Sequence, residues 1–454
     1  MTTDSRTKSI DMLHAPLTGS LILFALPIAF SSMLQQLFNA ADTAVVGRFA
    51  NADALAAVGT NGEIVALLVT LSAGLAVGAN VLIARLIGEG KTAQISDVLH
   101  TSLLCALIFG LFGALTGQWL ARPLLLAIHT PDTVLRDAVR YLRIYFAGYP
   151  FLMLYDFCAA ILRARGDSRS PFLALTLSGV VNMLLNLFFV IVCGLGVSGV
   201  AIATGLATAL SAILLLVSLC RADDAFHLSF GRLRIHREYL LPLLSIGVPA
   251  AVQGAVFCLA NIFVQASVNS FGAIATAGST IAMNFEYIGY YMITAFGQAA
   301  TTFTSQNYAA GNLLRCKRIL GICLWEATLF SAVITVPITL WCPFFSGLFS
   351  NDSEVIAAAC VRILLILSLE PICSFYEIPA GSLRGIGYST LPALLTILGT
   401  CVLRIAWIFT VFAHFHTLES LFVVFPLSWG VTILLVCGSL FLLHPFRSTP
   451  VISH

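Results

Sequence analysis

Apolar side chains occur along this chain in long, nearly uninterrupted runs, and polar, glycine and proline residues gather in the short breaks between them. A helix needs about 20 consecutive apolar residues to cross the hydrocarbon core of a bilayer, and each run approaches or exceeds that length. The pattern therefore predicts twelve transmembrane helices, at 18–43, 54–83, 97–121, 137–160, 170–192, 196–219, 240–268, 276–304, 317–341, 357–380, 391–413 and 419–443.

Composition indicates the same class of protein. Hydrophobic residues make up 59% of the 454 residues and charged residues only 10%, and the mean hydropathy is +0.96. A soluble domain of this length has too little interior to bury so much apolar surface, whereas a bilayer accepts it on every outward face. We therefore expect an all-α membrane protein.

The residue inventory disfavours several functional classes. The net charge of +2 does not indicate nucleic-acid binding, and no phosphate-binding loop for ATP occurs in the sequence. The twelve cysteines stand singly, without a CxxC pair or a Cys/His cluster at metal spacing, so no metal site and no cofactor are expected. His414 and His416 have no acidic neighbour beyond Glu419, and we predict that the protein is not an enzyme.

The most polar break, 220–239, divides the twelve spans into two sets of six. We therefore expect an N-terminal tail at 1–17, a first lobe at 18–219, a linker at 220–239, a second lobe at 240–443 and a C-terminal tail at 444–454. The N-terminal segment lacks the compact apolar core and small-residue cleavage site of a secretory signal peptide, so it is interpreted as a cytoplasmic tail.

The distribution of basic residues predicts the orientation, because cytoplasmic loops carry an excess of Lys and Arg. With the N-terminus inside, 16 of the 23 Lys and Arg residues lie on the cytoplasmic side, among them Arg6, Lys8 and Arg447. The outer side then holds Arg48, Arg122, Arg136, Arg140, Arg143 and Arg362. We expect both termini in the cytoplasm of a cell whose inner, or plasma, membrane the chain spans.

Two decapeptides are nearly the same. The stretch "LRARGDSRSP" starts at Leu162, and "LRGIGYSTLP" starts at Leu383 in the second half of the chain. Extended backwards to Pro150 and Pro371, the comparison gives eight identities in 22 positions, where ordinary residue usage predicts roughly one or two. An even number of spans per half gives both copies one orientation. The halves are therefore predicted to be parallel internal repeats, an architecture typical of alternating-access transporters.

Five phrases in this order resemble the multidrug and toxic compound extrusion (MATE) family: "LFNAADTAVVGRFANADALAAVG", "GLAVGANVLIARLIGEGK", "LRARGDSRSP", "VSGVAIATGLA" and "TFTSQNYAAGN". The resemblance covers roughly 18–443. It implies a two-lobe exporter that expels organic cations and other amphipathic drugs in exchange for protons or sodium. The same superfamily includes flippases for lipid-linked oligosaccharides, which are the alternative.

Asp42 is the first candidate for ion coupling. Spacings of four and three residues place Gln35, Asn39 and Asp42 on one polar stripe of the first helix, and Pro27 can bend that helix. An ionised carboxylate in lipid is costly, so the stripe is expected to face the lobe interior and Asp42 to exchange a proton there. The alternative is an interfacial Asp that caps the loop before Gly47; the resemblance to the family's first-helix acid favours the coupling role.

Asn182 and Asn186 are four residues apart and share one face of the fifth helix. In the proton-coupled branch that the chain resembles, an Asn is followed four residues later by an Asp that partners the first-helix acid. The second position here is Asn186, so coupling is expected to rest on Asp42 and on Glu63. Plain hydrogen bonding between helices is the other interpretation of the two asparagines.

Glu63 and Glu286 occupy matching places in the two halves. Tyr287, Tyr290 and Tyr291 follow Glu286, and an acid beside aromatic faces suits a lipophilic cation, so these four residues are predicted to bind substrate together with Gln35. Structural hydrogen bonds to neighbouring asparagines are the alternative for the two acids. The acids that the resemblance implies for a sodium site are replaced here by Phe257 and Cys373.

Arg404 lies at mid-depth in the eleventh predicted span and needs a partner. Glu370 and Glu377 are the expected partners, and the arginine is either part of a structural ion pair or a substrate contact. Glu377 is also seven residues before Arg384, a pairing that recurs as Asp156 with Arg163 and is expected to anchor the junction between helix and loop.

Together these features predict a secondary active multidrug exporter: a monomer that exchanges amphipathic cationic compounds for protons, with sodium as the other candidate ion and membrane lipids around it. A flippase would need a cleft basic enough for pyrophosphate, and Arg404 is the one arginine placed deep in a span.

Overall fold

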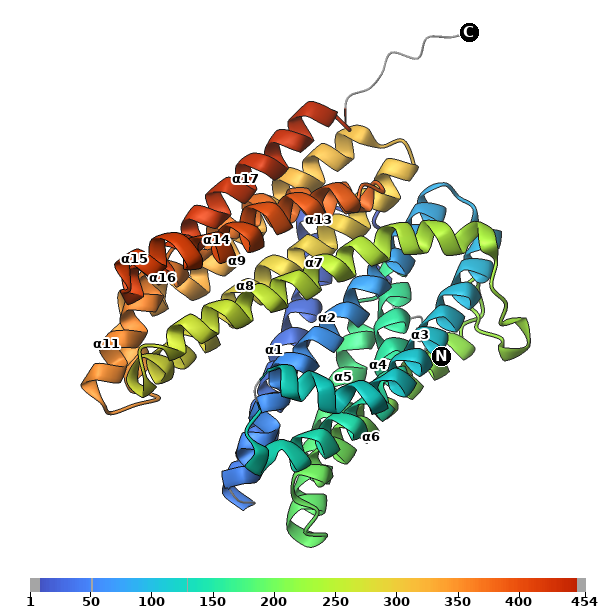
Figure 1. Ribbon diagram of the computed structural model, residues 1–454. Helices are drawn as coiled ribbons and strands as arrows, with labels where there is room; N and C mark the ends of the chain where they lie inside the picture. The colour runs from blue at the N-terminus through green and yellow to red at the C-terminus, as the bar shows by residue number, and fades with distance from the viewer. Residues whose placement is uncertain (1–8, 50–51, 129, 447–454) are drawn as a thin grey trace, which may run out of the picture. The chain divides into compact units, whose positions relative to one another are not determined.

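The computed structural model describes residues 9–49, 52–128 and 130–446. Within these ranges the chain is almost entirely helical and no strand occurs (Figure 1). Arg6, Lys8 and Arg447 lie outside the described residues, as do most of the two predicted tails.

Nine of the predicted spans correspond to long helices. The longest have 37 residues, roughly 55 Å, so they extend beyond the hydrocarbon core of a bilayer. The nine are α1 (Leu17–Phe49), α2 (Ala52–Gly88), α3 (Thr92–Ala127), α4 (Asp132–Arg165), α5 (Arg169–Leu187), α6 (Gly196–Cys220), α7 (Arg237–Asn269), α8 (Ala273–Ala309) and α9 (Leu313–Leu340). A π-helical turn, Phe188–Val192, extends α5.

The last three predicted spans are interrupted. The tenth consists of α11 (Ser353–Arg362), a π-helical turn at Ile363–Leu367, a 3₁₀ turn at Glu370–Cys373 and α12 (Ser374–Gly385). The eleventh consists of α13 (Thr390–Thr396), α14 (Leu403–Trp407) and α15 (Ala413–Phe415), joined by π-helical turns at Ile397–Val402 and Ile408–Phe412. The twelfth is α16 (Leu418–Phe422) followed by α17 (Val424–Leu443), and a short α10 (Cys342–Gly347) follows α9.

Eleven helical stretches in the described part of the chain are long and apolar enough to cross a membrane. The predicted span at 276–304 is a helix of 37 residues, α8, but it is not among the eleven because polar side chains are frequent along it. The prediction of a helical, multi-pass membrane protein is confirmed.

The chain forms two compact units, and two helices belong to both. Of the described residues, the first unit contains 9–10 and 30–251, and the second contains 11–29 and 252–446. The division falls within α1 and within α7, where the sequence pattern had assigned each helix to a single lobe. Pro27 lies two residues before Ala29, where the part of α1 in the second unit ends. Pro249 lies two residues before Ala251, where the part of α7 in the first unit ends. Both prolines weaken the backbone ladder where the helix changes unit.

In the first unit, α4 is the central helix. It packs against α2, α3 and α6, and α5 packs against α6 (Figure 1). Close approach of α7 to α2 depends on glycine, because a Cβ at Gly247 would lie 2.6 Å from the carbonyl oxygen of Leu75. The facing residues Gly74 and Gly78 form a small-xxx-small pattern that lets two helix backbones meet. The start of α7 therefore belongs to the first unit.

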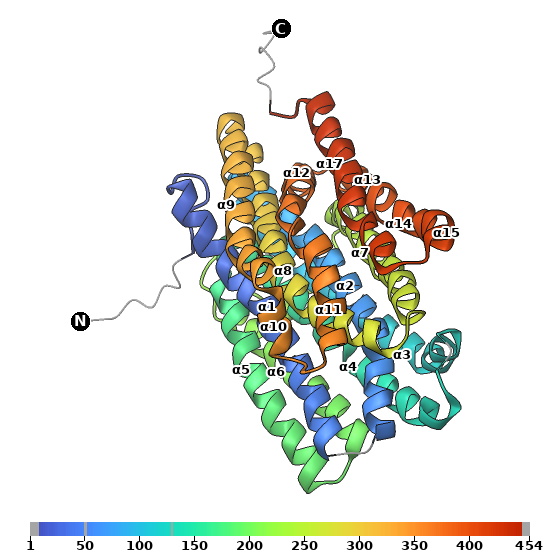
Figure 2. The same cartoon turned by 90° about the vertical axis from the view of Figure 1, so that its left-hand side faces the viewer.

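In the second unit, α8 packs against α9, α11 and α12 (Figure 2). The start of α1 belongs to this unit because Phe24 packs edge-on against Phe303, with ring centroids 5.5 Å apart. Just before the helix, the Met12 carbonyl oxygen accepts a hydrogen bond of 3.0 Å from Nδ2 of Asn307. Arg315 also donates to the Ala15 carbonyl oxygen at 2.5 Å.

Substitution of Gly247 by alanine is expected to lower stability by about 1–3 kcal/mol, because the new Cβ would overlap the Leu75 backbone. The measurement is the thermal unfolding midpoint of the purified protein in detergent. Gly62→Ala is the matched control, since nothing lies within 4 Å of a Cβ at Gly62. Equal midpoints for the two variants would contradict the close packing of α2 and α7.

Candidate functional site

The carboxylate of Asp42 lies inside the first unit, where three side chains hydrogen-bond to it. Asp42 is only 6% exposed. Asn182 donates from Nδ2 to Oδ1 at 2.9 Å, and Asn186 donates from Nδ2 to the same oxygen. Thr204 donates from Oγ1 to Oδ2 at 3.3 Å. We call these four residues, from α1, α5 and α6, the Asp42 cluster.

Local sequence explains why α1 and α5 meet at this point. Gly179, Asn182 and Asn186 share one face of α5 because they are three and four residues apart. A side chain at Gly179 would overlap the ring of Phe38, which lies one turn before Asp42 on α1. Gly179 therefore lets the ring of Phe38 pack against α5. One turn later, α1 places the Asp42 carboxylate beside the two asparagine amides.

The Asp42 cluster contains one acid and three neutral partners. Within the described part of the chain, no Lys or Arg lies within ion-pair distance of Asp42. The amide oxygens of Asn182 and Asn186 are buried and have no hydrogen-bond partner among the described residues. An oxygen-rich, uncharged surrounding of this kind can accept a cation or a proton.

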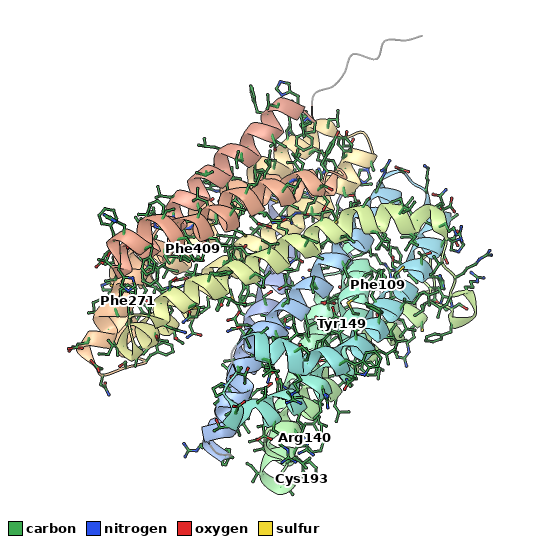
Figure 3. The ribbon with its side chains drawn as sticks, viewed as in Figure 1. Phe109, Arg140, Tyr149, Cys193, Phe271 and Phe409 are labelled. Atoms are coloured by element: carbon green, nitrogen blue, oxygen red, sulfur yellow. The ribbon has the colours of Figure 1, made fainter. Side chains whose placement is uncertain are left out.

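A small cavity adjoins the Asp42 cluster. Its volume is about 10 Å³, enough for one water molecule, and Thr204 forms part of its wall. The cavity is lined by Tyr145, Gly148, Tyr149 and Leu152 of α4 and by Thr204, Gly205 and Thr208 of α6. Figure 3 labels Tyr149 among the side chains of the first unit.

The predicted polar stripe of α1 is only partly buried. Asp42 faces the interior, but Gln35 is half-buried and Asn39 is exposed, so the prediction that all three face inward was wrong for Asn39. Three residues of an α-helix turn through about 300°, which leaves Asn39 about 60° away from Asp42 around the helix.

Glu63 does not join the Asp42 cluster. Its side chain is exposed, whereas Asn61, two residues earlier, is fully buried. Asn61 donates from Nδ2 to the carbonyl oxygens of Ala57 at 2.8 Å and Ala138 at 3.2 Å. The asparagine of the "NGE" segment therefore connects α2 with α4, and the acid is left at the surface of the unit.

Glu286 is already neutralised by an arginine. Arg362 donates from Nε and Nη2 to its two carboxylate oxygens at 2.6 and 2.8 Å, and from Nη1 to the hydroxyl of Ser279 at 2.5 Å. Arg362 is only 4% exposed. A paired carboxylate has little charge left to offer a cationic substrate, and the substrate role of Glu286 stays a prediction.

The tyrosines that follow Glu286 stack with other aromatic rings. Tyr287 and Tyr291 are a turn apart on α8, with centroids 6.0 Å apart. Tyr290 was expected over the Glu286 carboxylate, but its ring is stacked on that of Phe257 in α7 at 6.4 Å. All four side chains are half-buried, so the second unit has an accessible aromatic surface.

Arg404 does not pair with either predicted acid. Glu377 instead accepts from Nη2 of Arg384 at 3.1 Å, which confirms the predicted contact seven residues apart. Glu370 is buried against Gly289, and its Oε2 has no hydrogen-bond partner among the described residues. Arg404 donates from Nε to Ser428 at 3.1 Å.

Two features were missed at the sequence level. Thr204 completes the Asp42 cluster, although a threonine in an apolar helix carries no signal of its partner. Glu326 of α9 is 3% exposed, and neither carboxylate oxygen has a hydrogen-bond partner in the described chain. Its position in "GICLWEATLF", a lone acid in an apolar run, was the available signal.

Comparisons with known proteins agree with this architecture. The family model MatE matches the chain twice, at residues 27–188 and 249–410. A probable multidrug resistance protein of Bacillus subtilis, YoeA, is 27% identical over 432 residues, 92% of each chain. A relative from Shewanella oneidensis named as an FAD transporter is 26% identical and covers 76% of this chain and 77% of its own.

Solved structures share the fold. An outward-facing multidrug resistance MATE family transporter has a TM-score of 0.89 at 22% identity, covering 98% of this chain and all of its own. A transporter of the same superfamily from Pyrococcus furiosus, described as having a binding pocket of reverse polarity, has a TM-score of 0.90 at 22% identity. The two family matches, one in each half of the chain, support the parallel internal repeat. The chain therefore belongs to the MatE family of membrane transporters.

Proposed function

We propose that the protein is a proton-coupled antiporter that exports amphipathic, cationic compounds by alternating access. The observation that carries this proposal is the buried Asp42 carboxylate with only neutral partners. We further propose that it acts as a monomer without a cofactor in the bacterial inner membrane, with both termini in the cytoplasm.

The Asp42 cluster suits a group that gains and loses a proton. The ionised carboxylate accepts hydrogen bonds from Asn182, Asn186 and Thr204. The protonated acid has one O–H to donate, and the amide oxygens of the two asparagines have no other partner among the described residues. Each charge state therefore has hydrogen-bonding partners of the right kind.

Protonation changes how firmly α1 is held. Hydrogen bonds to an ionised acceptor are roughly twice as strong as bonds between neutral groups, so a proton on Asp42 weakens the attachment of α1 to α5 and α6. In the proposed cycle, protonation from outside rearranges the first unit and weakens substrate binding. Release of the proton inward restores the first arrangement.

Sodium is the alternative coupling ion. The acids of the family's sodium site are replaced by Phe257 and Cys373, which favours the proton. Carboxylate, amide and hydroxyl oxygens in the Asp42 cluster are nonetheless ligands that a hard cation accepts.

Aromatic faces support the class of substrate. Because Glu286 is paired with Arg362, attraction for an organic cation has to come from π faces, which Tyr287, Tyr290 and Tyr291 present. Relatives named as multidrug resistance proteins support drug-like substrates. A flippase for a lipid-linked oligosaccharide is the second candidate, and the buried Arg404, able to bind a pyrophosphate, is the observation in its favour.

Replacement of Asp42 by asparagine is expected to reduce proton-driven uptake of ethidium into everted vesicles to the level of vesicles without the protein. Asparagine keeps the shape of the side chain but cannot ionise. Glu63→Gln is the matched control, because Glu63 is exposed and outside the Asp42 cluster, and it should retain transport. Full activity of the Asp42 variant, at equal protein level, would exclude the proposed coupling residue.

The coupling ion can be tested with the unaltered protein in proteoliposomes. An imposed proton gradient is expected to drive ethidium accumulation, and a sodium gradient at uniform pH is expected to drive none. Accumulation under sodium alone would assign the coupling to sodium. If neither gradient drives transport, the antiporter proposal fails and the flippase becomes the leading candidate.

A further inference from the structure

Arg404 is the largest side chain buried almost completely in the described structure, with 2% of its surface exposed. It belongs to α14 in the second unit. Its guanidinium carbon lies 4.0 Å from the ring centroid of Phe425 and 5.7 Å from that of Phe257. Ser428 accepts the hydrogen bond from Nε.

Arg404 lacks the counter-charge that Arg362, the other arginine buried in the described part of the second unit, and the half-buried Arg384 have. Arg362 pairs with Glu286, and Arg384 pairs with Glu377. No carboxylate of the described residues lies within 4.0 Å of Arg404, and its terminal nitrogens donate no hydrogen bond to them. Aromatic rings and one hydroxyl offset part of the desolvation of a guanidinium, but they leave its full positive charge in place.

The internal repeat relates the position of Arg404 to the Asp42 cluster of the first unit. The two family matches end at Phe188 and Thr410, which lie six residues after Asn182 in the first unit and six residues after Arg404 in the second. Arg404 therefore lies in the second unit within one residue of the place that Asn182, a partner of Asp42, occupies in the first. A cation stands there beside an amide's place, so the second unit buries a positive charge where the first buries a negative one.

Backbone irregularity surrounds the same residue. The five-residue α14 lies between π-helical turns at Ile397–Val402 and Ile408–Phe412. Such turns are rare and are concentrated at functional sites, because they break the regular hydrogen-bond ladder. Two of the four π-helical turns in the described chain flank Arg404.

The rings near Arg404 indicate the shape of a ligand. Phe257 lies over the guanidinium, and Tyr290 is stacked on Phe257 with an angle of 7° between their planes. Both rings are half-buried, so part of this flat aromatic pair is accessible within one ring of Arg404. A ligand with a planar aromatic body can stack there while an attached group reaches the arginine.

We propose that Arg404 is the anion-binding residue of a substrate site in the second unit, which takes the carboxylate or phosphate group of a planar aromatic amphiphile. The planar fork of a guanidinium matches both groups with two parallel hydrogen bonds. The inference rests on the proposed export function and extends its substrates from cations to zwitterionic and anionic compounds. The same chemistry would also bind the phosphate of an anionic lipid headgroup.

The test compares two dyes that share a planar xanthene ring and differ in charge, fluorescein as the anion and rhodamine 123 as the cation. Binding to the full-length protein in phosphatidylcholine nanodiscs is measured by fluorescence polarisation. Arg404→Met is expected to weaken fluorescein binding by about tenfold or more, because a charge-assisted pair is lost, and to leave rhodamine 123 binding unchanged. Arg404→Lys, which keeps the charge and loses the fork, should show a smaller loss.

Arg318→Met is the matched control, because it removes an exposed arginine of the same unit. Thermal unfolding midpoints establish that each variant is folded. If Arg404→Met does not fold, the binding of the two dyes is measured with Arg404→Lys and Ser428→Ala instead. A loss of fluorescein binding alone is then expected. Unchanged fluorescein affinity in the folded Arg404 variants, or an equal loss for both dyes, would overturn the proposal.

A second set of nanodiscs, containing phosphatidylglycerol, distinguishes the two sources of the anion. If a lipid phosphate occupies the site, these discs weaken fluorescein binding to the unaltered protein but not to Arg404→Met. If the ligand is a soluble substrate, the lipid makes no difference that depends on Arg404. Ethidium uptake by Asp42→Asn vesicles tests the proton coupling and fluorescein binding by Arg404→Met tests the anion site, so failure of the proposed export function and failure of this inference give different results.

Discussion

A charged side chain inside a membrane protein has to be compensated by the protein itself, and this constraint organises the interior of both units. Glu286 with Arg362, and Glu377 with Arg384, meet it with opposite charges. Such ion pairs hold helices together only while both side chains stay charged. Asp42 meets the constraint with neutral amides and a hydroxyl instead. A carboxylate compensated in this way can lose its charge without leaving an unpaired cation behind, and this is what a coupling residue requires.

The division of α1 and α7 between the units connects this local chemistry to the fold. Asp42 lies in the part of α1 that belongs to the first unit, and residues before the division belong to the second. Pro27 and Pro249 are the first residues of the two family matches and so lie at equivalent places. Each half therefore has a proline at the point where its first helix passes from one unit to the other. A change in how firmly α5 and α6 hold α1 therefore acts on a helix that both units share.

Much of the fold and part of the site could be predicted from the sequence. Long apolar runs define spans, and the spacing of Asn182 and Asn186 places both amides on one face, where a buried acid needs donors. The Glu286–Arg362 contact could not be predicted, because its two residues are far apart in the sequence and meet only through the packing of α8 against α11. The π-helical turns left no trace in the hydrophobic pattern, since they change the hydrogen bonding and not the polarity of the segment.

The two repeats differ in the charge that each buries at similar places. The family matches end six residues after Asn182, a partner of the Asp42 acid, and six residues after Arg404. If the second unit also contained such an acid at this place, both halves would bury a carboxylate of the same negative charge. One acid and one arginine instead fit the two separate roles that we propose, proton exchange in the first unit and recognition of an anionic group in the second. The two halves share one scaffold, and the sign of the buried charge is what would distinguish the ligands of each half.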